Sequence, residues 1–164
     1  MVKGKRACVF WAGLIILASA SVALFVIILS PEGEYMHFRE DWRGGEETRV
    51  LLIDSRLYYG VYEESFHRTG YSVEKGDPCI IINGTIRNDY DKGYYFCITA
   101  DVYNSKGEKV EPILTIHSPV PYFTVAYAKR GSTSVFVIQI PYEGKDVESY
   151  QLWIIYNPME TPPA

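Results

Sequence analysis

The chain carries an uninterrupted apolar run near its start, Ala7 to Ser30, preceded by the basic residues Lys3, Lys5 and Arg6. As an α-helix rising about 1.5 Å per residue, the run would be roughly 36 Å long, enough to cross a hydrocarbon core of about 30 Å. Because backbone amides cannot stay unpaired in lipid, we expect a single transmembrane helix. The run separates a short basic leader, 1–6, from the rest of the chain.

The charges that flank this run predict its orientation. The basic residues come before it, and the acidic residues Glu32 and Glu34 follow it. The positive-inside bias places the basic leader in the cytoplasm and the body of the chain outside. We therefore expect a single-pass protein of the cell membrane that contacts the lipid bilayer through 7–30.

Two processed forms remain open. Ala18-Ser19-Ala20 has the small-x-small pattern of a signal-peptide cleavage site, and cutting there would release a secreted chain that begins at Ser21. Alternatively, a short basic leader, an apolar helix and a β-rich head resemble a pilin-like filament subunit. In that case cleavage after the pair Arg6-Ala7 would leave a mature helix that begins at Cys8.

The body that follows the apolar run is acidic and large enough for one domain. From Pro31 onward it has 13 basic and 20 acidic residues, a net charge of −7. Such a surface repels phosphate backbones, so we do not expect a nucleic-acid partner. Its roughly 134 residues suffice to bury one core.

The residue pattern after position 48 predicts an all-β domain over 49–157. Short β-rich runs alternate with turn signals every 8–12 residues, which is typical of an antiparallel β-sandwich of about seven strands. The segment 66–78 reads as a long connection with Gly and Pro breakers. Strands are expected at 49–53, 57–63, 79–87, 94–103, 110–116, 122–128, 134–140 and 149–156.

Two of these strands have a clear inner face. In 79–87, Ile80, Ile82 and Ile86 share one face, and a turn at Asn104 to Gly107 follows the strand 94–103. The residues of 94–103 that alternate inward are Phe96, Ile98, Ala100 and Val102.

Two segments flank the predicted domain. In the juxtamembrane segment 31–48, Tyr35, Phe38 and Trp42 have the spacing of one face of a short helix, which Gly44-Gly45 would end. Their aromatic rings would rest on lipid headgroups or pack on the domain, unless the segment is an irregular linker. The proline-rich end, 158–164, is expected to be a loose tail.

The stretch 80–156 resembles the FxLYD-domain family, which comprises immunoglobulin-like β-sandwiches of prokaryotic envelope proteins. Of the motif that names the family, only Tyr103 is kept; Ala100, Val102 and Asn104 replace the others. The resemblance implies an immunoglobulin-like fold and an envelope address, and it brings no shared reaction or binding residues. It rests on Ile82–Asn88, on Ala100–Asn104 followed by Gly107, and on Gly131–Phe136 with Ile140-Pro141.

Two cysteines lie in the body, Cys79 and Cys97. A hairpin that turns near Tyr90-Asp91 would place them on adjacent antiparallel strands, with Cys97 opposite about Gly84. The two sulfurs would then be too far apart to bridge, so we expect two free, half-buried thiols. A disulfide would mean that this register is wrong.

We find no residue pattern that predicts catalysis or a cofactor, and we expect a non-catalytic protein. Asp89-Tyr90-Asp91-Lys92-Gly93 begins like a calcium loop, but Ala100 stands where the bidentate Glu belongs, and a turn explains the same residues. The histidines have no partner at metal-ligand spacing, so no metal site is expected. They are His37, His67 and His117.

Two surface features are candidate sites. Asn83-Gly84-Thr85 is an N-glycosylation sequon, although Gly84 is equally explained as a strand feature. A second candidate is a group of aromatic residues, because Tyr is favoured at interfaces. Burial in the domain explains the same group. Its members are Tyr58, Tyr59, Tyr62, Phe66 and Tyr71. We interpret the body as a binding module for an envelope protein or a surface polymer.

Overall fold

The computed structural model of this chain describes residues 33–68, 71–110 and 122–163. The leader residues Lys3, Lys5 and Arg6 and the apolar run 7–30 lie outside these ranges. Among the residues that the structure describes, no helix is long and apolar enough to cross a membrane. The anchor, its orientation and its processing therefore remain predictions.

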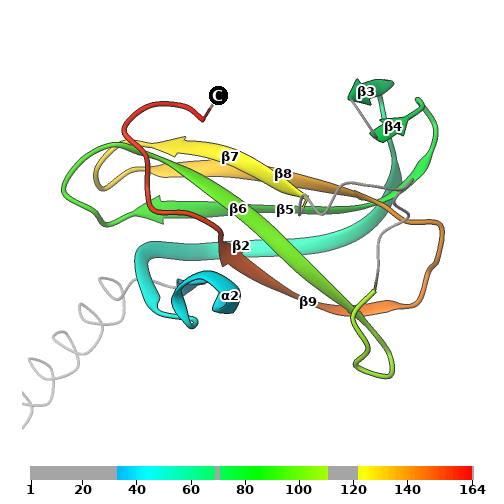
Figure 1. Ribbon diagram of the computed structural model, residues 1–164, viewed down its shortest axis with the longest axis horizontal. Coiled ribbons are helices and arrows are strands. Elements are labelled where there is room, and N and C mark those ends of the chain that lie inside the picture. The colour runs from blue at the N-terminus through cyan, green and yellow to red at the C-terminus, as the bar shows by residue number, and fades with distance from the viewer. Residues whose placement is uncertain (1–32, 69–70, 111–121, 164) are drawn as a thin grey trace, which may run out of the picture. The chain divides into compact units, whose positions relative to one another are not determined.

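Most of the described residues are in strands and almost none are helical, so the all-β class is confirmed (Figure 1). One short helix, α2, spans Glu40–Arg43. The strands are β1 (Glu34–Phe38), β2 (Glu47–Val61), β3 (Phe66–Arg68), β4 (Tyr71–Val73), β5 (Pro78–Asn88), β6 (Tyr94–Asn104), β7 (Phe123–Ala128), β8 (Thr133–Pro141) and β9 (Val147–Ile154).

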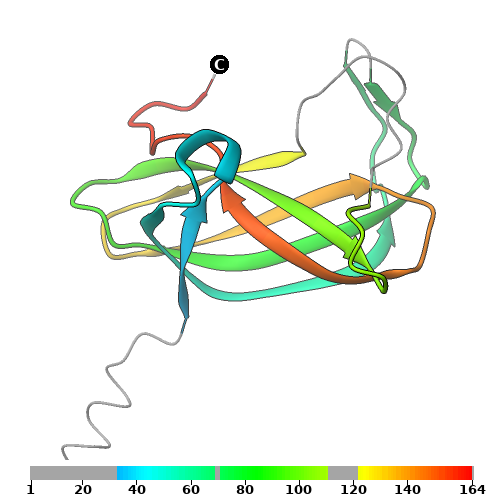
Figure 2. The same ribbon diagram turned by 60° about the horizontal axis from the view of Figure 1, so that its bottom comes forward.

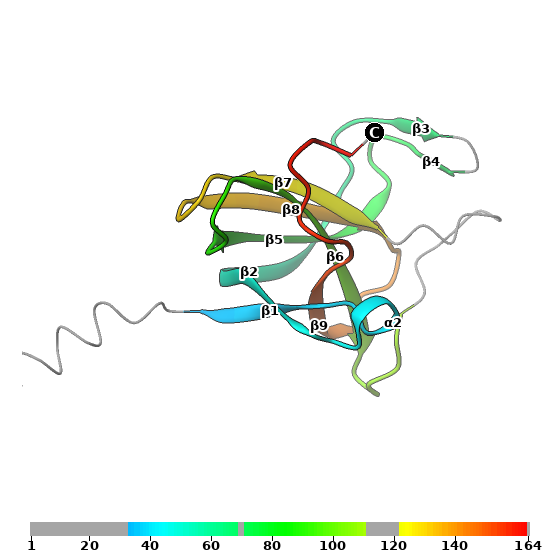
Figure 3. The same ribbon diagram turned by 60° about the vertical axis from the view of Figure 1, so that its left-hand side comes forward.

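Seven strands form one mixed, nearly closed sheet in the order β7-β6-β9-β1-β2-β5-β8. The expectation of a purely antiparallel sheet is wrong at one pair, since β1 runs parallel to β9 with His37 opposite Trp153. The cause is that β1 inserts between β9 and β2. The two edge strands, β7 and β8, run beside each other without pairing, as Figures 1 and 3 show.

The core lies inside this sheet. On β5, Ile80, Ile82 and Ile86 share the inner face as predicted, and each is fully buried. The predicted inward residues of β6 also contact the core: Phe96, Ile98 and Val102 are buried, and Ala100 packs against them. Removing such side chains from water is the main favourable contribution to folding.

The segment 31–48 packs on the domain through Phe38, which was one of the three alternatives, but the predicted helical spacing from Tyr35 to Trp42 is wrong. Residues 34–38 form a strand, and only Glu40–Arg43 is helical. Met36 and Phe38 point into the core, so pairing between two strands overrides the helical spacing. Figure 2 shows the chain passing from β1 through α2 into β2. Gly44 ends the helix as expected, with a φ of 63° and its N–H bonded to the Glu40 carbonyl.

Strand β2 is continuous where a break was expected. The segment Asp54–Arg56 lies within it, and only a register irregularity between Leu52 and Asp54 marks the site. The whole length of β5 pairs with β2, and this pairing keeps Asp54, Ser55 and Arg56 within the strand. The predicted connection 66–78 contains the hairpin β3–β4, which forms a separate two-stranded sheet.

The C-terminal segment contacts the domain and is not loose as far as residue 160. Tyr95 and Met159 exchange two backbone hydrogen bonds of 2.8 and 3.1 Å. Lys92 Nζ lies 2.8 Å from Glu160 Oε1. The strand predicted at 110–116 falls outside the described residues, apart from Val110.

Candidate functional site

The structure divides the predicted aromatic group. Tyr58 and Tyr59 are adjacent on β2 and point to opposite sides of the sheet. Tyr58 is 42% exposed, whereas the Tyr59 hydroxyl accepts a 2.9 Å hydrogen bond from the backbone N–H of Val147. Tyr59 therefore links β2 to β9.

The other members of the group do not join Tyr58 either. Tyr62 is buried against Val73 and Cys79, in a small cluster outside the main core. Phe66 is exposed on β3, and the side chain of Tyr71 lies outside the described part of the structure. Tyr62 thus belongs to the packing. Tyr59 is 38% exposed despite its bond to Val147, so a contact role stays a prediction for Tyr58, Tyr59, Phe66 and Tyr71.

Cys79 and Cys97 are free, as predicted, but they are fully buried and not half-buried. The predicted register is nevertheless wrong, because β5 and β6 are not neighbours in the sheet. Cys97 lies opposite Val125 on β7, and Cys79 lies opposite Pro141 on β8. Burial raises the pKa of both thiols and so disfavours the reactive thiolate form of each.

Asn83 lies in the middle of β5 on the outer face. Its side-chain oxygen accepts a 3.2 Å hydrogen bond from Arg56 Nε. A Cβ on the next residue, Gly84, would lie 2.4 Å from the Asp54 carbonyl oxygen and 2.8 Å from the Phe136 ring. The close approach explains this glycine, and glycosylation of Asn83 stays a prediction.

No group of three potential metal ligands occurs among the residues that the structure describes. His37 Nδ1 lies 2.7 Å from the Gly45 carbonyl oxygen, and His67 Nδ1 lies 2.6 Å from Ser72 Oγ. His117 lies outside the described residues.

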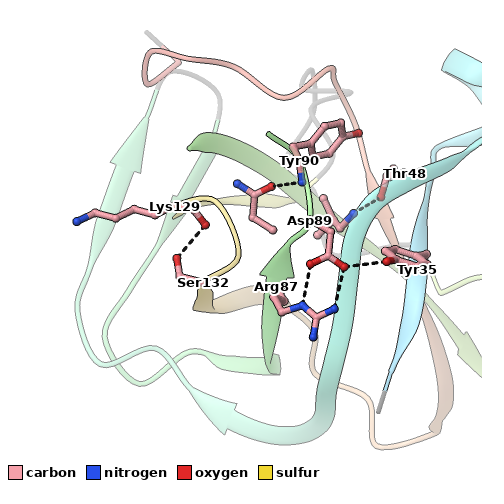
Figure 4. Close-up of polar contacts among 9 residues, drawn as sticks. Tyr35, Thr48, Arg87, Asp89, Tyr90, Lys129 and Ser132 are labelled. Atoms are coloured by element: carbon pink, nitrogen blue, oxygen red, sulfur yellow. Dashed lines mark hydrogen bonds and ion pairs between the residues drawn. The ribbon is translucent and has the colours of Figure 1, made fainter. Parts of the chain in front are cut away.

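A polar corner joins the N-terminal strand to the turn between β5 and β6. Arg87 donates two 2.8 Å hydrogen bonds to the carboxylate of Asp89, and the Tyr35 hydroxyl donates a third of 2.7 Å (Figure 4). The bonds from Arg87, with a smaller contribution from Tyr35, hold the pKa of Asp89 below its usual value. Because both carboxylate oxygens are occupied, Asp89 is not arranged as a calcium ligand.

Asn88 completes this polar corner and is fully buried. Its amide nitrogen donates to the carbonyls of Lys92 and Ala128, at 2.7 and 2.9 Å, and its side-chain oxygen accepts from the Tyr90 N–H. Its backbone carbonyl accepts from Gly131. One residue therefore ties the end of β5 to the start of β6 and to the connection between β7 and β8.

The outer side of β7 and β8 exposes apolar side chains, and we call this surface the seam because it lies where the two sheet edges meet. Val135 is 75% exposed, the largest fraction among the exposed large hydrophobic residues of the described chain. Inner residues of the same strands, such as Phe136 and Ala126, are buried. Two strands thus carry apolar residues on both faces. The seam consists of Phe123, Val125, Tyr127, Val135 and Val137.

Sequence reasoning missed the seam, although the sequence carries a signal for it. Val135-Phe136-Val137-Ile138 is a continuous apolar run, whereas a strand with one solvent-exposed face should alternate apolar and polar residues. On the seam, exposed apolar side chains of β7 and β8 lie where these two strands run beside each other. Contiguous exposed apolar area on a soluble domain marks an interaction site.

Comparison with known proteins gives this chain no relative. No family model matches it, and neither a curated protein nor a solved structure matches it.

Proposed function

We propose that this protein is a non-catalytic binding module of the cell envelope, and that the seam is its contact surface. The exposed apolar residues on β7 and β8 are the observation that carries the proposal. They offer affinity to a partner without a cleft or a reacting group. The partner is an envelope protein or a surface polymer.

The envelope address rests on the sequence. The apolar run 7–30 would anchor the chain in the lipid bilayer, and the basic leader would hold the N-terminus in the cytoplasm. The β domain, whose acidic surface suits an aqueous exterior, would then lie outside.

The finer fold assignment is part of this proposal. We propose that the nearly closed sheet is an immunoglobulin-like sandwich, with β2, β5 and β8 on one side of the core and β1, β9, β6 and β7 on the other. Core residues contributed by both sets support this arrangement. The resemblance of 80–156 to FxLYD domains points to the same architecture.

Photo-crosslinking in intact cells tests the contact surface. A photoreactive residue replaces Tyr127 in the full-length chain, and a matched variant carries it at Tyr58, which has similar exposure on β2. We expect a defined crosslinked species from Tyr127 that Tyr58 does not give. If Tyr127 gives none, the seam is not a contact surface.

The predicted location in the cell envelope is tested by identifying the mature N-terminus and by treating intact cells with protease. An intact Met1 or Val2 in membrane-extracted protein supports the anchor. A start at Cys8 favours the filament subunit, and a start at Ser21 makes the chain secreted. Protease added to intact cells should remove the β domain, and protection until lysis would contradict the outer location.

A further inference from the structure

We propose that the occupant of the seam is a second copy of this chain, packed face to face about a two-fold axis with the two β8 strands antiparallel. This inference rests on the proposed binding function and names the partner. A two-fold contact uses the same surface on both copies, so the seam must complement itself when it is turned around. Its apolar middle and its charged ends meet that condition.

The middle of the seam is apolar. Val137, 48% exposed, lies near the middle of β8, and Val135 on the same strand and Tyr127 on β7 lie between it and the connection that joins the two strands. With Val137 on the two-fold axis, Val137 would meet its own copy and Val135 would lie over Gln139 of the other copy. Withdrawing these valine side chains from water would supply favourable free energy of association.

One end of the seam is cationic. Lys129 and Arg130 lie in the connection between β7 and β8, and both are exposed. Neither forms a salt bridge within the described part of the chain. The connection is fixed, because the Asn88 carbonyl accepts from Gly131 and the backbone N–H of Asn88 donates to the Ser132 carbonyl at 3.1 Å. These charges therefore project from a defined position.

The opposite end of the seam is acidic. Glu143 and Asp146 lie in the connection that follows β8, are exposed and outnumber the single cation there, Lys145. The Asp146 carboxylate accepts a 2.5 Å hydrogen bond from the Tyr142 hydroxyl, which leaves Glu143 as the most available anion. A strand rises about 3.3 Å per residue, so each charged end lies roughly 15–20 Å from Val137.

These distances make the antiparallel pairing specific. When two copies meet with Val137 on the axis, Arg130 of each copy lies over Glu143 of the other. A parallel arrangement would instead place like charges together. An anionic lipid surface fits less well, because it would attract the cationic end and repel the acidic end.

Engineered cysteines test the axis. Val137→Cys in the full-length chain, with Cys8 replaced by serine, is expected to form a disulfide-linked dimer in membranes under mild oxidation. Val61→Cys, similarly exposed at the end of β2, is the matched control and should stay monomeric. Cys79 and Cys97 are buried and should not interfere. Equal linkage at both positions, or none at Val137→Cys, would overturn the two-fold packing.

Charge reversal tests the pairing of the ends. Arg130→Glu and Glu143→Arg should each weaken association about tenfold or more, because each places like charges together twice in the dimer. Mixing the two variants should restore association, since every contact is then opposite in sign. No rescue on mixing would overturn the inference. A monomeric chain that still gives a crosslink to another molecule from Tyr127 would also overturn it, while leaving the binding function intact.

Discussion

The polar corner and the seam use their side chains in opposite ways. At the corner, Arg87, Asp89 and Tyr35 direct their polar groups at one another, and the Asn88 side chain is bonded to the turn before β6 and to the end of β7. On the seam, apolar side chains of β7 and β8 point to solvent. The polar groups of the corner are therefore paired within the chain, whereas the apolar side chains of the seam have no such cover in the described structure, and we propose that another molecule covers them.

This difference separates stability from function. A buried polar group costs free energy unless it is hydrogen-bonded, so a change at the corner should destabilise the domain. An exposed apolar side chain contributes little to folding, so a change on the seam should spare it. The two regions are nevertheless coupled, because Asn88 fixes the connection that carries the cationic end of the seam.

Removing the Asn88 amide should destabilise the domain more than any other change at the corner. Asn88→Ala leaves the Lys92 and Ala128 carbonyls and the Tyr90 N–H without their partner, and we expect a loss of about 3 kcal/mol in the free energy of unfolding. Urea unfolding of the full-length chain in detergent measures it. Asn83→Ala, which removes a single bond on the outer face, is the control and should cost much less.

Asp89→Asn should have an intermediate effect that depends on pH. Near neutral pH we expect a loss of about 1–3 kcal/mol, because the bonds from Arg87 and Tyr35 lose their charged acceptor. The folded-state pKa of Asp89 is lowered chiefly by the bonds from Arg87. Its stabilisation is therefore complete above the unfolded-state pKa of about 3.9 and disappears as pH falls through the folded-state value.

The measurement is the free energy of unfolding against pH for the wild type and for Asp89→Asn. The two curves should converge as pH falls below about 4. If the difference in free energy of unfolding between the two proteins did not change with pH, the charge of the Asp89 carboxylate would not contribute to stability. Tyr35→Phe removes one of the three bonds and should cost about 1 kcal/mol.

The strands were predictable where one face of the strand is exposed to solvent and the other is buried. The alternation of Ile80, Ile82 and Ile86 predicted β5, and Asn104 to Gly107 predicted the turn after β6. The N-terminal strand was not predictable, because Tyr35, Phe38 and Trp42 fit a helix equally well. Only the free edges of β9 and β2 make Met36 and Phe38 core residues.

The pairing of the strands also could not be predicted from the sequence. A hairpin between β5 and β6 is the simplest reading of the turn at 88–93, but the chain crosses there from one side of the core to the other. Tyr62 shows the same limit for the candidate site, since the hairpin β3–β4 buries it. Tyr58 and Tyr59 separate because adjacent strand residues face opposite sides.

The smallest effect on stability is expected on the seam. Val137 and Ile138 are adjacent on β8 and point to opposite faces, with exposed fractions of 48% and 1%. Val137→Thr keeps the shape of an exposed side chain, so it should change the free energy of unfolding by less than about 0.5 kcal/mol. Ile138→Thr removes apolar contact from the core and places a hydroxyl there, so it should cost about 2–4 kcal/mol.

Val137→Thr and Ile138→Thr together compare the outer and inner faces of β8, provided that the free energy of unfolding and the association between copies are measured on the same samples. Val137→Thr should weaken crosslinking between copies while the unfolding curve stays close to that of the wild type. A large loss of stability in Val137→Thr would mean that this valine is covered in the folded chain and that the seam is part of the packing. Unchanged association would mean that the apolar middle does not drive the contact, and the charged ends alone would have to hold the two copies together.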